Sequence, residues 1–162
     1  MLSPLFPVLY VQLSPERLVV RDVKSGDQLS EVPEVAISPA PKVRILGVGA
    51  SARDSAAAVA QSRVVNPFAH PRSLISDFTV AQQLLKEFVR RALGGRLFRL
   101  APVVVIHPLG SPAGGFTQVE NRAFRELAMG VGASKVFVWH GRSLSDQEVL
   151  SRQFPAGGQV EE

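Results

Sequence analysis

Residues 102–140 read PVVVIHPLGSPAGGFTQVENRAFRELAMGVGASKVFVWH, and they carry the clearest indication of the fold. The runs 102–107 and 135–139 are short and rich in β-branched and aromatic residues, which is typical of buried strands. Between them, Thr117 and Glu120 have the spacing of a capping box, which predicts the start of a helix. A strand, a helix of roughly 15 residues and a second strand form a βαβ unit, so we expect two parallel strands with a right-handed crossover.

Apolar residues recur at helical spacing after Thr117, and they predict the face of this helix that packs on the sheet. The helix should end at Gly130 or Gly132, because glycine readily adopts the conformation that follows a helix. The residues expected on the buried face are Val119, Ala123, Phe124, Leu127 and Ala128.

An earlier segment predicts a second amphipathic helix. Ser76 or Asp77 can cap its start, and Gly94-Gly95 should end it. Arg90 and Arg91 fall in the last turn, where cations interact favourably with the helix dipole. The apolar positions of its buried stripe are Val80, Ala81, Leu84, Leu85, Phe88, Val89 and Ala92.

The first 38 residues predict an antiparallel meander of three strands. The strands are expected at residues 8–13, 18–23 and 29–37, joined by turns at Pro15 and at Ser25-Gly26-Asp27. Two further elements should follow. Residues 43–48 alternate well enough for a strand, and the alanine-rich residues 50–64 favour a helix.

These elements predict an α/β fold with a mixed sheet, in which an antiparallel meander continues into parallel strands with flanking helices. Such an arrangement suits a ribonuclease-H-like core. We expect one domain over residues 1–142, followed by a C-terminal segment, 143–162, with a short helix and a flexible tail. The apolar residues of that segment should either cover a face of the domain or leave that face to a homodimer. They are Leu144, Val149, Leu150 and Phe154.

Composition excludes several classes of protein. The chain has 162 residues, 46% of them hydrophobic, which suits one folded domain and excludes a wholly disordered chain. It has no cysteine, so disulfides, thiolate nucleophiles and cysteine-bound metals are excluded. No apolar run approaches the roughly 20 residues of a membrane-spanning helix, and the N-terminus has no basic region typical of a secretory signal. By elimination, we expect a cytoplasmic protein.

The net charge of +4 raises the question of an anionic partner. The tightest basic group is Arg90, Arg91, Arg96 and Arg99. It lacks regular aromatic interleaving beyond Phe98, so the sequence favours an ordinary solvated surface over nucleic-acid binding.

Four short motifs, in this order, resemble the MreB family of bacterial actins. They are Glu34 to Ser38, Asp77 to Val80, Val119 to Ala123 and Gly130 to Val136, and the similarity extends over residues 8–141. The resemblance implies the first half of an actin-type ATPase, which is a ribonuclease-H-like domain. MreB and actin chains are about twice as long and bind ATP in a cleft between two halves, whereas this chain matches only the first half.

The resemblance also identifies altered nucleotide-loop positions. The family's first phosphate loop reads Asp-x-Gly-Thr, and here Gln12 stands in place of the aspartate and Ser14 in place of the glycine. Pro15 removes an N–H donor from the same turn. After the strand that ends at Trp139, His140-Gly141 occupies a place where the family has a carboxylate. We therefore expect no ATPase activity, no catalytic residue and no cofactor.

The two histidines leave a further question open. His140 is either a general base in a remodelled site or a polar residue at the end of a strand. His107 ends the preceding parallel strand, so both should lie at one edge of the sheet. Without nearby Asp, Glu or Cys they make a poor metal site.

These features predict an MreB-like, non-catalytic actin-fold protein that acts as a structural or binding component of the bacterial cell-shape cytoskeleton. The alternative is an ATP-binding actin-like ATPase, using Mg²⁺, whose missing half comes from another chain. The expected partner is a second copy or an MreB-type cytoskeletal protein. Leu2, Leu5 and Phe6 offer contact with a membrane surface, as the resemblance implies, or with the core or a partner.

Overall fold

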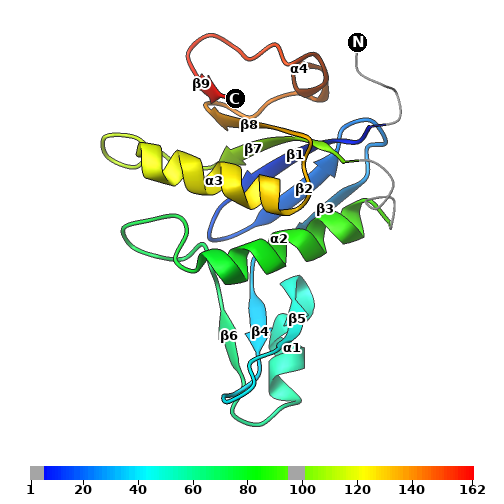
Figure 1. Cartoon of the computed structure of the whole chain (residues 1–162), viewed down its shortest axis with the longest axis vertical. Helices are drawn as coiled ribbons and strands as arrows, with labels where there is room; N and C mark the ends of the chain where they lie inside the picture. Colours follow the sequence, from blue (N-terminus) through cyan, green and yellow to red (C-terminus); the bar gives the residue numbers. More distant parts are fainter. Residues whose placement is uncertain (1–5, 95–100) are drawn as a thin grey trace.

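The computed structural model describes residues 6–94 and 101–162, and Figure 1 shows how their helices and strands are arranged. The elements in chain order are β1 (Val8–Leu13), β2 (Leu18–Asp22), β3 (Gln28–Glu31), β4 (Val35–Ile37), β5 (Ile45–Val48), the 3₁₀ turn η1 (Gly49–Ser51), α1 (Ala52–Ala57), β6 (Arg63–Val65), α2 (Phe78–Ala92), β7 (Val103–Pro108), α3 (Gln118–Gly130), β8 (Lys135–His140), α4 (Asp146–Ser151) and β9 (Gln159–Glu161).

A six-stranded mixed sheet forms the centre of the molecule, in the order β3-β2-β1-β7-β8-β9. The meander is confirmed, because β1 pairs antiparallel with β2, and β2 with β3. The parallel part is confirmed as well, since β7 pairs parallel with both β1 and β8. The observed sheet is therefore the mixed α/β arrangement expected from the sequence.

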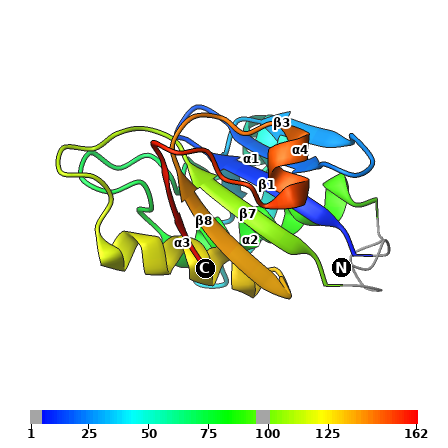
Figure 2. The ribbon, with the colours of Figure 1, turned by 90° about the horizontal axis from the view of Figure 1, so that it is seen from above.

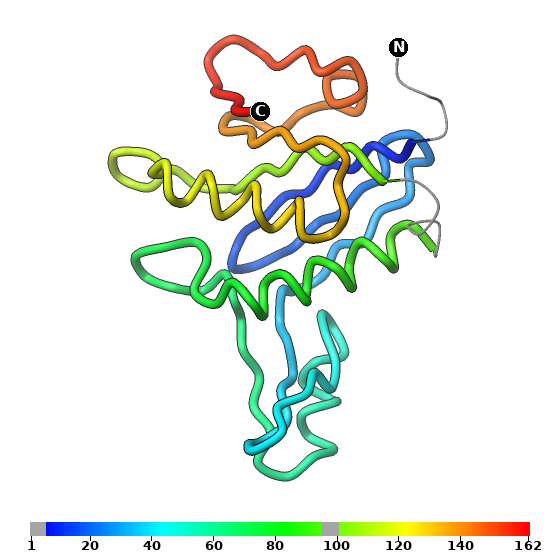
Figure 3. The backbone as a smooth tube through the Cα atoms, in the orientation of Figure 1, coloured from blue at the N-terminus to red at the C-terminus, as the bar shows by residue number. Residues whose placement is uncertain are grey.

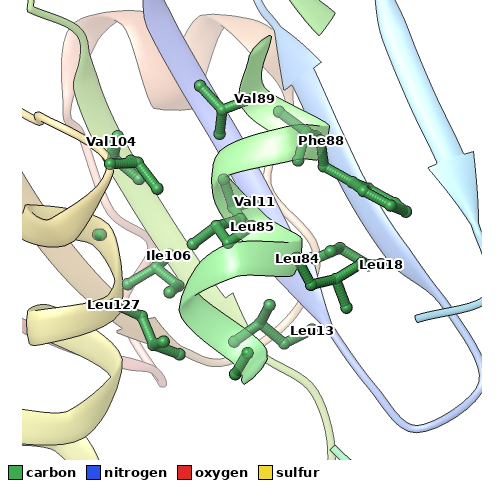
Figure 4. Packing of buried hydrophobic residues seen from close by; sticks show 14 of the residues in the cluster. Val11, Leu13, Leu18, Leu84, Leu85, Phe88, Val89, Val104, Ile106 and Leu127 are labelled. Carbon is green, nitrogen blue, oxygen red and sulfur yellow. The ribbon is translucent and has the colours of Figure 1, made fainter. Parts of the chain in front are cut away.

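Helices α2 and α3 lie side by side on one face of this sheet (Figure 1). Asp77 caps α2 by accepting from Val80 N at 3.1 Å, and Thr117 and Glu120 form the predicted capping box of α3. Figure 4 shows how the side chains of α2, among them Leu84, Leu85 and Phe88, meet those of the strands. These side chains are fully buried and form the main hydrophobic core.

The prediction for the buried face of α3 is wrong at Val119, whose side chain is 79% exposed. Ala123 is only half-buried, whereas Phe124, Leu127 and Ala128 are buried as expected. In the first turn the buried position belongs to Asn121, which bonds to polar groups of β8 and β9. Helical periodicity predicted that Val119 is the buried residue of the first turn, but Asn121 is buried there instead.

Residues 29–37 do not form one strand, which corrects the sequence interpretation. They divide into β3 and β4, which belong to different sheets. Pro33 lies between them and has no N–H to donate to a ladder. Strand β4 is the centre of a small second sheet in the order β5-β4-β6, which hangs below α2 in Figure 1.

The helix expected over residues 50–64 is shorter than predicted. Only Ala52–Ala57 is α-helical, and residues 63–65 form β6. Gln61 has a φ of 62°, in the left-handed region, so the helix cannot continue through it. The β-branched Val64 and Val65 that follow suit a strand better than a helix.

The C-terminal segment covers the second face of the six-stranded sheet, and Figure 2 shows α4 lying over the strands. Leu144 and Val149 are buried there, with Leu150 and Phe154 packed against the same cluster. Their partners on the sheet include Tyr10, Phe137 and Trp139. Of the two alternatives stated for these apolar residues, the structure shows the covered face.

The last residues of the chain contain a further strand, and the flexibility expected for this tail stays a prediction. Residues 159–161 form β9, which pairs antiparallel with β8 in the register Trp139↔Val160. Phe154 stacks on Trp139 with ring centroids 5.4 Å apart, which holds the intervening loop close to the sheet. The short helix is present as α4, and the division of the chain at residue 142 stays a prediction.

Some sequence predictions fall outside the described residues. Leu2 and Leu5 lie there, as do Gly95, Arg96 and Arg99. Phe6 is described and half-buried, and its carbonyl accepts from Lys24 Nζ at 2.6 Å. None of the helices within residues 6–94 and 101–162 has the length and apolar character that crossing a bilayer requires.

Candidate functional site

The carboxyl ends of β1, β7 and β8 meet at one edge of the six-stranded sheet, as the tube in Figure 3 shows. Gln12 is opposite His107 in the parallel register of β1 and β7. The Gln12 side-chain amide donates to Ser143 Oγ at 3.2 Å. This edge is where open α/β sheets place their ligands, so it is the candidate site.

The turn after β1 is closed by hydrogen bonds of its own. Ser14 N donates to the Arg17 carbonyl at 3.1 Å, and Arg17 N donates to Ser14 Oγ at 3.0 Å. Pro15 has no N–H, and its carbonyl accepts from Asn66 Nδ2 at 2.7 Å. Two backbone N–H groups of this turn are therefore already bonded, and a third is absent.

A buried network crosses the sheet beside Gln12. Leu144 N donates to Tyr10 Oη at 3.0 Å, and Tyr10 Oη is 2.7 Å from His107 Nδ1. His107 Nε2 is 2.9 Å from the carbonyl oxygen of Gly141. Because a carbonyl can only accept, Nε2 carries the proton and Nδ1 accepts from Tyr10. The network ties β1 and β7 to the loop that follows β8.

Burial determines the charge state of this network. It lowers the pKa of His107 from its usual 6.5 to about 4, against the opposing effect of the Gly141 hydrogen bond. Burial also raises the pKa of Tyr10. Both groups are therefore neutral near pH 7, and His107 is a fixed structural link between strands.

His140 lies at the same edge but on the other face of the sheet. Its Nε2 is 2.6 Å from Asn121 Oδ1, and its ring stacks on Phe116 with centroids 5.0 Å apart. Asn121 Nδ2 donates to Glu161 Oε1, so Asn121 Oδ1 is the acceptor and His140 Nε2 the donor. Burial lowers the pKa of His140, opposed by Glu161 and Glu120. His140 Nδ1 is buried and has no hydrogen-bond partner among the described residues.

A hollow of about 560 Å³ lies beside His140. Its walls are the glycine-rich loops at residues 110–116 and 157–159, together with Asn121 and Gly141. Among the described residues, no group of three or more His, Asp or Glu side chains is placed to hold a metal ion.

The structure therefore brings together only some of the predicted site residues. Gln12 and Gly141 both form hydrogen bonds on the α4 side, Gln12 with Ser143 and Gly141 with His107, whereas the His140 ring faces α3. Ser14 is used within its own turn. His107 and His140 share the edge of the sheet, as expected, but they point to opposite faces.

Sequence reasoning missed Tyr10, Asn121 and Ser143. Tyr10 lies two residues before Gln12 on the same face of β1, so its place beside His107 follows from strand alternation once β1 and β7 are known to pair. Asn121 gave a weaker signal, as a polar residue within the expected apolar stripe. Nothing in the sequence indicated Ser143, because its contact depends on how the loop after β8 returns to β1.

Comparison with known proteins identifies the family of the chain and its fold. The family model described as MreB/Mbl protein matches residues 11–144. The cell shape-determining protein MreB of Escherichia coli (strain K12) is 39% identical over 66 residues, which are 40% of this chain and 18% of the relative. The MreB of Haemophilus influenzae is 38% identical over 65 residues, again 40% of this chain and 17% of the relative.

Two solved structures share the fold. The crystal structure of MreB5 of Spiroplasma citri bound to ADP superposes with a TM-score of 0.64 and 21% identity, covering 82% of this chain and 37% of that one. The AMPPNP-bound form gives a TM-score of 0.60, 20% identity, and coverage of 82% and 38%. The chain thus spans less than two fifths of these structures and has an actin-like, ribonuclease-H-like α/β fold. With two parallel strand pairs, the capping box and the family match over residues 11–144 in agreement, the chain belongs to the MreB/Mbl family.

Proposed function

We propose that this chain is a non-catalytic actin-fold protein, acting as a structural or binding component of the bacterial cell-shape cytoskeleton in the cytoplasm. Membership of the MreB/Mbl family supports the link to cell shape. The proposed partner is a second copy of the chain or an MreB-type protein, which would meet the actin-fold surface without nucleotide in a cleft.

The observation that carries this proposal is the closed turn after β1. A phosphate-binding loop presents free backbone N–H groups to the anion. Here Ser14 N and Arg17 N are bonded within the turn, and Pro15 has none to offer. Glu16 adds a negative charge to the same turn, which repels phosphate.

The position at which the family would hold Mg²⁺, Gln12, supports the same proposal. Mg²⁺ prefers carboxylate oxygens, water and phosphate as its ligands. Gln12 is neutral, and its amide nitrogen is engaged with Ser143. The residues present therefore do not fit a hydrated Mg²⁺ with a nucleotide, and we derive no reaction step through one.

Thermal unfolding with and without Mg-ATP tests the proposal. A ligand present at 100 times its Kd stabilises the native state by about 2.7 kcal/mol, which shifts Tm by several degrees. We expect the unfolding curves with and without about 5 mM Mg-ATP to coincide. A ligand present well below its Kd adds little to the stability of the native state, so it leaves Tm unchanged. A shift of several degrees that requires Mg²⁺ would contradict the proposal.

The alternative, an ATPase completed by another chain, rests on the relatives that were crystallised with ADP and AMPPNP. It predicts a different result for the complex. If the chain is purified from its native host with a bound actin-fold partner, Mg-ATP would raise the Tm of that complex while leaving the isolated chain unchanged. Under the proposal, the isolated chain does not respond, and the complex responds no more than its partner does alone.

A further inference from the structure

The last 18 residues, 145–162, contain α4 and β9, and we call them the strap. They lie beyond the family match, which ends at residue 144. The strap crosses one face of the six-stranded sheet and then follows its β8 edge (Figure 2). Leu144, just before it, is fixed by a hydrogen bond from its N–H to Tyr10 Oη at 3.0 Å. The strap therefore begins at a fixed point on the sheet.

The strap and the rest of the chain have opposite net charge. Four acidic residues and one arginine give the strap a net charge of −3, whereas residues 1–144 carry +7 of the total of +4. Every acidic side chain of the strap is paired with a residue outside it: Asp146 with Arg21, Glu148 with Arg142, Glu161 with Asn121 and Glu162 with Lys135. Asp146 accepts two hydrogen bonds from Arg21, of 2.8 and 2.6 Å. The strap is therefore seated on the sheet as an acidic ligand would be.

Little apolar surface holds the strap in place. Among its residues, all of which the structure describes, only Val149 is buried. Leu150 and Phe154 are partly buried against the same cluster, and all three residues of β9 are exposed. Ion pairs whose partners are partly exposed, as in Arg21–Asp146, contribute modestly to stability. A segment with so few buried side chains opens at a lower free energy than the core beneath it.

Two features of Arg152 oppose the closed position of the strap. Its φ is 54°, in the left-handed region that residues other than glycine rarely adopt. Its Nε and Nη2 atoms are buried and have no hydrogen-bond partner among the described residues, although the guanidinium lies 5.7 Å from the centroid of the Phe137 ring. A buried N–H without a partner costs free energy, because the same group is hydrogen-bonded in water. Release of the strap would remove both costs.

The surface beneath the strap has the composition of a protein-binding site. Tyr10, Phe137 and Trp139 form its aromatic centre, and Arg21 lies beside them, where it bonds to α4. Tyr, Trp and Arg are the residue types that most often dominate the binding energy of protein interfaces. The strap itself shows which kind of ligand this surface takes, namely an acidic segment with aliphatic and aromatic side chains.

We propose that the strap is a releasable intramolecular ligand, which keeps this surface closed until an acidic, apolar segment of a partner protein replaces it. The partner segment would place an aromatic ring against Trp139, as Phe154 does, and a carboxylate against Arg21. Because the strap is tethered beside its site, it competes at an effective concentration that is roughly millimolar. The surface is separate from the turn after β1, so the inference does not rest on the proposed function.

A fluorescent synthetic copy of residues 145–162, added to the whole chain, tests the proposal by fluorescence anisotropy. Asp146→Lys loses the pair with Arg21 and brings two cations together, so it should loosen the strap. We expect this variant to bind the peptide at least about tenfold more tightly than the wild type, because the competing strap is weakened. Equal binding by the wild type and Asp146→Lys, or binding by neither, would overturn the proposal.

Asp54→Lys is the matched control for charge. It makes the same change on α1, at the opposite end of the molecule from α4 in Figure 1, and Asp54 is exposed. This variant should bind the peptide as weakly as the wild type does. Equal strengthening in both variants would show that net charge alone attracts the peptide, which would overturn the proposal. So would a dimer of Asp146→Lys in light scattering that takes up no peptide, since a second copy would then be the occupant.

Amide hydrogen exchange gives a second measurement, which needs no peptide. Val149 N donates to the Ser145 carbonyl at 3.1 Å within the strap, and its amide should exchange much faster than that of Leu85 in α2. Arg152→Gly removes the unpaired N–H groups and suits the left-handed φ, so it should slow exchange at Val149. Exchange at Val149 as slow as at Leu85, or no slowing in Arg152→Gly, would contradict a strap that is held closed against a cost.

Discussion

At the scale of single residues, His107 shows how burial changes the behaviour of a side chain. Its folded pKa of about 4 lies below its usual 6.5, so between these values the unfolded chain binds a proton that the folded chain does not. Stability is therefore full above pH 6.5 and falls as the pH drops toward 4. We expect a loss of about 3 kcal/mol in the free energy of unfolding over this range, measured by urea denaturation. His140, whose pKa burial also lowers, adds a loss of the same sign.

One variant separates His107 from other effects of acid. His107→Gln cannot take up a proton, so its free energy of unfolding should depend less on pH than that of the wild type. An identical slope in the wild type and His107→Gln would show that His107 does not titrate as proposed.

At this scale the sequence shows which residue types stand at motif positions, but it does not show which side chains contact each other. Gln12 and Ser14 were singled out only because the resemblance sets them against a family motif, and their role in an altered nucleotide loop stays a prediction. The Tyr10–His107 hydrogen bond joins residues 97 positions apart, and no local pattern indicates such a pair. The exposure of Val119 was also missed, because periodicity does not show where a helix extends beyond its sheet.

At the scale of secondary-structure elements, the close approach of the 155–159 loop to β8 allows a sharp test. A Cβ added at Gly158 would collide with the Trp139 ring and the His140 carbonyl, which are both held in place. Gly158→Ala should therefore lower the free energy of unfolding by about 1 to 3 kcal/mol, as overpacking does. Gly130→Ala is the matched control, because the added methyl meets only the movable end of Gln82. If chemical denaturation shows the two variants to be equally stable, β9 is not held against β8 as described.

The elements with strong local signals were predicted well. The capping box at Thr117 and the cap at Asp77 fixed the starts of α3 and α2, because these side chains bond to backbone only three residues away. Strands β4, β6 and β9 have three residues each, which is too short for a period to be visible. All three residues of β9 are exposed and two of them are polar, so only its pairing with β8 defines it.

At the scale of the whole molecule, the C-terminal segment makes the sheet a buried layer. It lies beyond the family match at residue 144, apart from its first residues, and it covers Tyr10, Phe137 and Trp139. Deleting residues 143–162 would expose these side chains as one apolar patch, and monomers rarely expose large patches. We expect the truncated chain to be less soluble and to have a higher apparent mass in light scattering.

Deleting only residues 159–162 provides the control for this truncation, because α4 and Phe154 then remain. That shorter deletion should keep the mass of the wild type. Circular dichroism would establish that both truncated chains retain the helices α2 and α3. A soluble chain of unchanged mass after the longer deletion would mean that the segment does not protect this face.

The mixed character of the sheet was predictable, because the parallel and antiparallel parts have different sequence patterns. Parallel strands β7 and β8 are continuous apolar runs around a capped helix, whereas the meander has turn residues between short strands. The separate small sheet was not predicted. Strand β5 was expected as a strand within residues 43–48, but β4 was read as the end of the meander and β6 as part of a helix. Only the break at Pro33 marks the change of sheet.

The pairing of β1 with β7 has a consequence for the order in which the molecule forms. Val8 lies opposite Val103, so the 94 residues 9–102 are synthesised between the two members of this pair. The small sheet, by contrast, closes within residues 35–65. Contacts between distant residues form slowly, because a long loop must close before they contribute. We therefore expect the small sheet to form early during synthesis on the ribosome. The hairpin of β1 and β2 keeps an apolar face exposed until β7 has been synthesised.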